Sequence, residues 1–126
     1  MAELTILDGA VGTVLQNAGQ KKVALNIGSA GGPLEPLGTL SFDAAYESYA
    51  QMVRAGARAG ADLVVVEAMT DLADVRVAVL AVREQSDLPV WVTMDFDASG
   101  RTAAGTSVGC MACTLDGFGV SAMGIS

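Results

Sequence analysis

The chain has 126 residues, of which 52% are hydrophobic and 17% charged, and its formal net charge is −7. This length suits one domain, which can bury roughly two thirds of its unfolded surface, and the apolar composition excludes a disordered chain. Because phosphates require a basic surface, the negative charge argues against nucleic acid and against an anionic membrane as partners.

The sequence contains no histidine and only two cysteines. The absence of histidine excludes a Ser-His-Asp triad and removes the commonest metal ligand. Two cysteines three residues apart make no disulfide framework, and no run approaches the roughly 18 apolar residues of a membrane-spanning helix. The acidic start, Met1–Leu4, lacks the basic head of a signal peptide. We therefore predict a reducing, cytoplasmic location.

Short apolar runs alternate along the chain with longer helical stretches, a pattern typical of βα units and a parallel sheet. The expected strands span residues 5–8, 22–27, 63–67, 89–94 and 122–125. Their nearly continuous apolar character predicts burial on both faces, as for parallel strands packed between helices. Trp91, in the fourth run, is expected to pack between the sheet and a helix.

Three helices are predicted between these strands, over residues 42–59, 71–85 and 107–116. Ser41 is a suitable N-cap for the first helix, and Gly60 is its expected stop signal. The third helix is expected to stop at Gly117 and Gly119. Within it, Cys110 and Cys113 form a lone C-x-x-C, which is half a zinc site at most, and we interpret both as small apolar residues of the fold.

Two acidic residues stand where predicted strands end. Glu67 follows three valines, and Asp8 precedes a glycine-containing turn, residues 9–13. Because ligands of parallel α/β proteins bind at the C-terminal edge of the sheet, both are candidates for binding a small substrate. The alternatives are structural: Glu67 as a helix cap or a partner of Arg101, and Asp8 as an N-cap.

The glycine-rich loop, residues 28–33, could bind an anion through its backbone N–H groups. It is neither a Walker motif, since no Gly-Lys-Ser/Thr follows, nor a dinucleotide fingerprint, since no helix opens at its glycines. We favour a loop over the edge of the sheet.

Four segments together carry a more specific pattern. They are residues 7–16 (LDGAVGTVLQ), 65–71 (VVEAMTD), 89–102 (PVWVTMDFDASGRT) and 119–125 (GVSAMGI). In this order they resemble segments of the homocysteine-binding domain of cobalamin-dependent methionine synthase, whose matching motifs include V-E-T-M-T-D and P-V-W-V-T-M-S-F-D. The resemblance is continuous from about Phe42 to Ser126.

The resemblance implies a (β/α)8 TIM barrel that binds homocysteine for methyl transfer. In the family, a zinc ion held by three cysteine thiolates binds the substrate sulfur, and the thiolate attacks the methyl group of methylcobalamin on another domain. By resemblance, Asp8 and Glu67 bind the homocysteine ammonium, and the backbone of the turn with Gly9, Ala10 and Thr13 meets its carboxylate. No catalytic or metal-binding residue of this chain is assigned.

The chain departs from the family pattern at the zinc ligands. Gly124-Ile125-Ser126 stands where the family has G-I-N and then its first zinc cysteine, and Cys110 and Cys113 match none of the three. Only residues 17–22 separate the first two expected strands, where the family has a helix and another strand. We therefore predict a truncated, internally shortened barrel of about five βα units, a single domain over residues 1–126.

Such a partial barrel is expected to form an open sheet, to associate with a copy of itself, or to pair with the rest of the enzyme. We expect it to bind neither zinc nor methylcobalamin alone and to be inactive in methyl transfer by itself. Two alternatives remain: a non-catalytic, flavodoxin-like α/β binding module, and a fragment without independent function.

Overall fold

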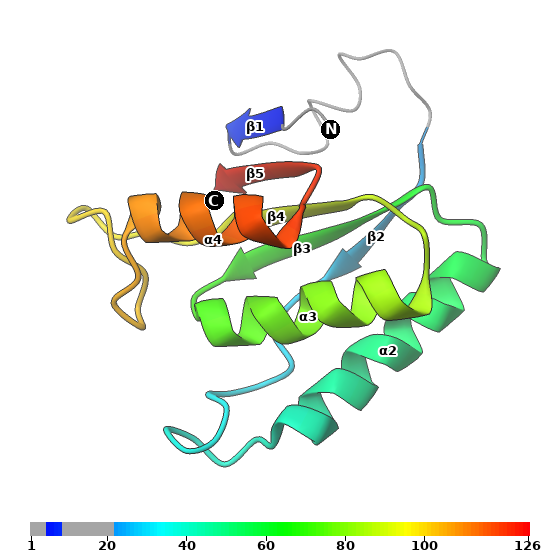
Figure 1. Ribbon diagram of the computed structural model, residues 1–126, viewed down its shortest axis with the longest axis horizontal. Helices are drawn as coiled ribbons and strands as arrows, with labels where there is room; N and C mark the ends of the chain where they lie inside the picture. The colour runs from blue at the N-terminus through cyan, green and yellow to red at the C-terminus, as the bar shows by residue number, and fades with distance from the viewer. Residues whose placement is uncertain (1–4, 9–21) are drawn as a thin grey trace.

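The computed structural model describes the backbone of residues 5–8 and the whole of residues 22–126 (Figure 1). Five parallel strands form one sheet in the order β1-β5-β4-β3-β2. The strands are β1 Thr5–Asp8, β2 Ala24–Ile27, β3 Leu63–Met69, β4 Val90–Met94 and β5 Ala122–Ile125. The predicted parallel α/β class is confirmed, and over the described residues the sheet is open, as expected of a partial barrel.

Three described helices connect the last four strands: α2 Phe42–Arg58, α3 Leu72–Gln85 and α4 Val108–Phe118. Each begins with a side-chain cap, because Ser41, Asp71 and Ser107 accept hydrogen bonds from the otherwise unpaired N–H groups of the first turn. None of the helices among the described residues combines the length and the apolar character needed to cross a bilayer.

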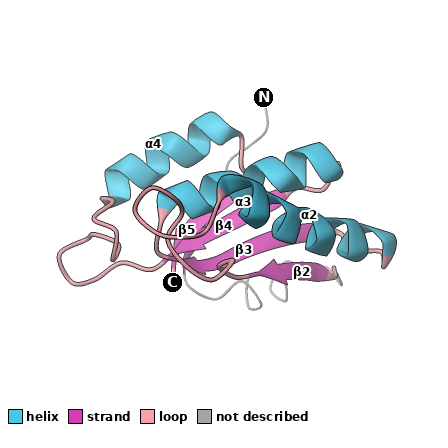
Figure 2. Ribbon diagram, turned by 90° about the horizontal axis from the view of Figure 1, so that it is seen from below, coloured by secondary structure: helices cyan, strands magenta, loops and turns pink. Residues whose placement is uncertain are grey.

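The three helices cover the same face of the sheet (Figure 2). From β2 to β5 each strand pairs with the next strand along the chain. Right-handed crossovers between successive neighbours place every connecting helix on one side. The main core therefore lies between this face and the helices, and Val64, Val66 and Val92 belong to it.

The opposite side of the sheet, here called the far face, carries a second apolar cluster. It consists of Leu63, Val65 and Ala122, with Ala24 and Trp91 packed against them. The prediction that Trp91 packs between the sheet and a helix is therefore wrong. Side chains alternate along a strand, and Val90 and Val92 occupy the helix side of β4, which turns Trp91 to the far face.

The end of α4 also differs from the prediction. The helix continues through Gly117 to Phe118 and is capped by Gly119, whose φ of 73° is left-handed. Only the second of the two predicted stop glycines therefore ends the helix. Cys110 and Cys113, predicted as small apolar residues of the fold, are both exposed, whereas Met111 and Ala112 between them pack in or against the core.

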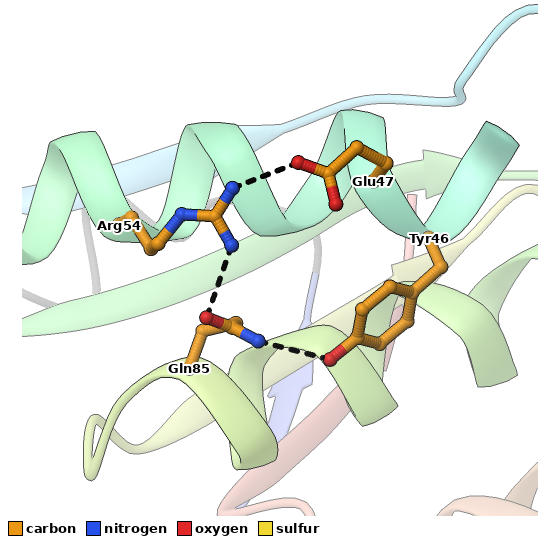
Figure 3. Close-up of polar contacts among 4 residues, drawn as sticks. All are labelled: Tyr46, Glu47, Arg54 and Gln85. Atoms are coloured by element: carbon orange, nitrogen blue, oxygen red, sulfur yellow. Dashed lines mark hydrogen bonds and ion pairs between the residues drawn. The ribbon is translucent and has the colours of Figure 1, made fainter. Parts of the chain in front are cut away.

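A polar connection fixes the end of α3 against α2 (Figure 3). Gln85 donates to the Tyr46 hydroxyl at 3.1 Å and accepts from Arg54 at 3.1 Å. Arg54 also pairs with Glu47, two turns earlier on α2, at 2.9 Å. Gln85 thus uses its amide as donor and acceptor at once and links α3 to α2.

Candidate functional site

All five strands run in the same direction, so their C-terminal ends share one edge of the sheet. The backbone of Asp8 ends β1 at this edge, and Glu67 lies near the end of β3. β5 and β4 lie between β1 and β3. The side chain of Asp8, and the predicted binding residues Gly9, Ala10 and Thr13, lie outside the described residues.

Glu67 sits in a β-bulge. β3 pairs with β4 at Val66↔Val92 and again at Met69↔Met94. Two residues of β3, Glu67 and Ala68, therefore stand against the single residue Thr93 of β4. Ala68 has a φ of 56°, which a residue with a side chain rarely adopts.

The bulge residue Ala68 is held by a side chain of the neighbouring strand. Its N–H donates to the Thr93 hydroxyl at 3.2 Å, and Thr93 is only 1% exposed. A bulge interrupts the ladder of backbone hydrogen bonds, and the Thr93 hydroxyl accepts from this N–H in place of a strand carbonyl, although Ala68 itself is exposed. Bulges are common next to active sites, where they redirect a side chain.

The Glu67 side chain belongs to the far face, by alternation with Leu63 and Val65. It is half-buried, and its Oε2 accepts from Nδ2 of Asn26 on β2 at 2.5 Å. Asn26 is in register with Val65, two residues before Glu67, so the two side chains meet diagonally across neighbouring strands.

Neither structural alternative for Glu67 is found in the structure. The N-cap of α3 is Asp71, and the Arg101 guanidinium donates to the carbonyl of Gly105 at 2.9 Å. Within residues 22–126 Glu67 takes part in no ion pair. Its charge is thus bonded to a neutral amide and is not compensated by a described cation.

The sequence pattern was not read as marking Asn26 and Thr93 as neighbours of Glu67, although it contains a sign of their role. Each is a polar residue inside an otherwise apolar expected strand. Strand alternation places Asn26 on the side of Ala24, and Thr93 on the side of Trp91, both on the far face. The same alternation, applied to all strands together, would have placed them beside Glu67.

A second polar cluster lies behind the glycine-rich loop. Asp74, 3% exposed, accepts from the Tyr49 hydroxyl at 2.5 Å and from the Ser29 hydroxyl at 2.7 Å. Tyr49 in turn accepts from the N–H of Ala30. Burial, with the neighbouring Asp74 carboxylate, raises the pKa of Tyr49 well above its usual range. A carboxylate bonded directly to this loop disfavours an anion there.

The described residues do not fit the zinc site of the family. No three His, Cys, Asp or Glu side chains of that part of the chain lie together as a possible metal site. Cys110 and Cys113, the only cysteines of the sequence, are exposed on α4, outside the sheet. The thiolate set that holds zinc in the family therefore has no counterpart among these residues.

Two cavities of the described structure lie away from Glu67. The larger, about 620 Å³, is lined by α3, the end of α4 and the start of α2, and includes Arg76, Leu80 and Phe118. The smaller, about 250 Å³, lies near the turn before β4. Neither cavity is lined by Asn26 or Glu67. The candidate site is therefore identified by the polar side chains of Asn26 and Glu67 near the strand ends, and not by the size of a cavity.

Comparison with known proteins supports the family suggested by the sequence. No curated protein matches the chain. A family model described as homocysteine S-methyltransferase matches residues 18–126, which include β2 to β5 and Glu67 but not the segment 7–16. The role assigned to Asp8 in the first strand thus remains a prediction. Because the match covers most of its length, the chain belongs to the homocysteine S-methyltransferase family.

Proposed function

We propose that this chain is the homocysteine-binding part of a methionine-synthase-like methyltransferase, and that Glu67 binds the substrate ammonium. The observation that carries the proposal is the position of Glu67: a half-buried carboxylate at the C-terminal edge, in a β-bulge, with no described cation beside it. In parallel α/β proteins this edge is where small ligands bind.

The chemistry of the group suits an α-amino acid. A carboxylate bonded to an ammonium forms a charge-assisted hydrogen bond, which contributes about 1.5–3 kcal/mol. Asp8, on the first strand of the same edge, is proposed as a second carboxylate for that ammonium. The turn with Gly9, Ala10 and Thr13 is proposed to meet the substrate carboxylate through its backbone.

Titration calorimetry with homocysteine tests the proposal. Glu67→Gln keeps the shape of the side chain and removes its charge, so we expect affinity to fall roughly 10- to 100-fold, as the loss of one charge-assisted bond requires. Glu84→Gln is the matched control, because Glu84 is exposed on α3 and its variant changes the net charge equally. Equal affinities for the Glu67 and Glu84 variants, or no binding by the wild type, would contradict the proposal.

The methionine-synthase context, with methylcobalamin as donor and a cytoplasmic location, belongs to the proposal and rests on the resemblance of residues 65–71, 89–102 and 119–125. In the family, zinc supplies a stabilised substrate thiolate. Since the only two thiols are exposed on α4, we propose that residues 1–126 by themselves bind no zinc and transfer no methyl group. Stoichiometric zinc together with turnover of the isolated chain would contradict this.

A further inference from the structure

We infer that Asn26 and Thr93 are positioning residues for Glu67: Asn26 orients its carboxylate from β2, and Thr93 holds the backbone of the next residue, Ala68, from β4, while the charge of Glu67 stays available for the substrate ammonium. This inference rests on the proposed function and deepens it. The inference follows from two contacts: that of Glu67 with β2, and that of the bulge residue Ala68 with β4.

On the β2 side, the contact with Asn26 fixes one carboxylate oxygen. An ionised carboxylate only accepts hydrogen bonds, so the amide nitrogen Nδ2 of Asn26 must be the donor to Oε2, at 2.5 Å. Among the described residues no hydrogen bond reaches Oε1, which is therefore available to a ligand. Because an amide is neutral, it restricts the orientation of the carboxylate without compensating its charge, whereas an arginine or lysine in its place would compete with the substrate for that charge.

On the β4 side, Thr93 stabilises the backbone that carries Glu67. A left-handed φ costs a residue such as Ala68 roughly 1–2 kcal/mol. The hydrogen bond from its N–H to the Thr93 hydroxyl offsets part of this cost and gives the N–H an acceptor inside the bulge. Thr93 is buried at 1% exposure, although Ala68 itself is exposed. The Thr93 hydroxyl therefore contributes to holding the bulge, and with it the position of Glu67.

The two residues are expected to differ in their effect on folding. Asn26 is exposed, and a hydrogen bond between exposed groups contributes little to stability because water competes for both partners. Removal of its amide should therefore act on ligand binding alone. Thr93 is buried, so its removal should act on both stability and binding, and Thr93→Ser, which keeps the hydroxyl, is needed beside Thr93→Val.

The test compares homocysteine with 4-mercaptobutanoate, which is homocysteine without the amine. If Asn26 orients Glu67 toward the ammonium, Asn26→Ala lowers the affinity for homocysteine about 2- to 5-fold, the effect of one exposed hydrogen bond of about 0.5–1 kcal/mol. The same variant leaves the affinity for 4-mercaptobutanoate unchanged. A purely structural role would lower both affinities together. Thr93→Val is expected to reduce the preference for homocysteine, and Thr93→Ser to restore it.

The outcomes separate this inference from the proposed function. If wild-type protein binds homocysteine and Glu67→Gln weakens binding, but Asn26→Ala leaves the ratio of the two affinities unchanged, the positioning role is overturned and the proposed function stands. If Thr93→Ser and Thr93→Val behave alike, the role of the Thr93 hydroxyl is overturned. If wild-type protein binds no homocysteine, both are overturned.

Discussion

Asp74 is buried, although its position in the first turn of α3 indicates an exposed carboxylate. A carboxylate in the first turn of α3 is expected to face solvent and to benefit from the helix dipole. Here it is 3% exposed and is held by hydroxyl donors from α2 and from the loop after β2. A buried carboxylate is tolerated only when its oxygens are hydrogen-bonded. Asp74 therefore needs the hydrogen bonds that the Tyr49 and Ser29 hydroxyls donate.

Removal of the Tyr49 hydroxyl should therefore be costly. Tyr49→Phe takes a donor from the buried Asp74 and an acceptor from the N–H of Ala30, and we expect the free energy of unfolding to fall by about 1–3 kcal/mol. Urea denaturation followed by circular dichroism measures this loss. Tyr46→Phe is the matched control: its half-buried hydroxyl bonds only Gln85, so the expected loss is about 0.5–1.5 kcal/mol. Equal losses in the two variants would show that the buried carboxylate adds nothing.

At the scale of elements, the end of α4 depends on one glycine of the two near it. Gly119 has a φ of 73°, and a Cβ there would lie 2.7 Å from Nη1 of Arg83. Gly117 is inside the helix, and a Cβ there meets no atom within 4 Å. The two positions are only two residues apart, but their backbone conformations differ: Gly117 is helical and Gly119 is left-handed.

Alanine at these two positions should have opposite effects on stability. Gly119→Ala is expected to destabilise the protein by about 1–2 kcal/mol, the cost of a left-handed conformation for a residue with a Cβ. Gly117→Ala is expected to stabilise it by about 0.5–1 kcal/mol, because alanine favours a helix interior over glycine. Thermal unfolding of both variants and the wild type measures these changes in stability. A stabilising Gly119→Ala would contradict the helix end described above.

The elements could be predicted from the sequence to the extent that their signals are local. The helices begin close to where the helical pattern starts, with Ser41, Asp71 and Ser107 as caps, and all five expected strands are found.

Trp91 was assigned to the wrong face because a buried strand is apolar on both sides, so its sequence pattern does not distinguish the two faces. The neighbours of Glu67 depend on how β2, β3 and β4 align, which is a non-local property, and an alanine at position 68 gives no sign of a positive φ.

At the scale of the whole molecule, the sheet has two edges over the described residues, β1 on one side and β2 on the other. An unpaired edge strand offers N–H and C=O groups to another chain. Val23, just before β2, is 62% exposed, and its N–H is already bonded to the Asp62 carboxylate at 2.8 Å. Because its exposed apolar side chain lies beside this edge, we propose the β2 edge as the surface for association with a second copy.

Sedimentation over a range of concentrations, at about 0.15 M salt so that the charge of −7 is screened, tests this association. Val23→Lys places a charge beside the edge without altering the backbone contact to Asp62, and we expect the dissociation constant of a dimer formed through the β2 edge to rise on the order of tenfold. Met52→Lys, on the exposed side of α2, is the control for an added lysine. A monomer at all concentrations, or equal effects of the two lysines, would exclude the β2 edge.

The place of β1 in the sheet has a consequence for how this protein could ever be completed into a barrel. The chain order of β2 to β5 advances one strand at a time, and the next position, beside β5, is taken by the four-residue β1. Any polypeptide that supplied later strands would find the position beside β5 occupied and would have to displace β1 from it first. Complementation would then proceed by strand exchange, with a rate governed by the release of β1 and independent of how much complementing polypeptide is added once it is in excess.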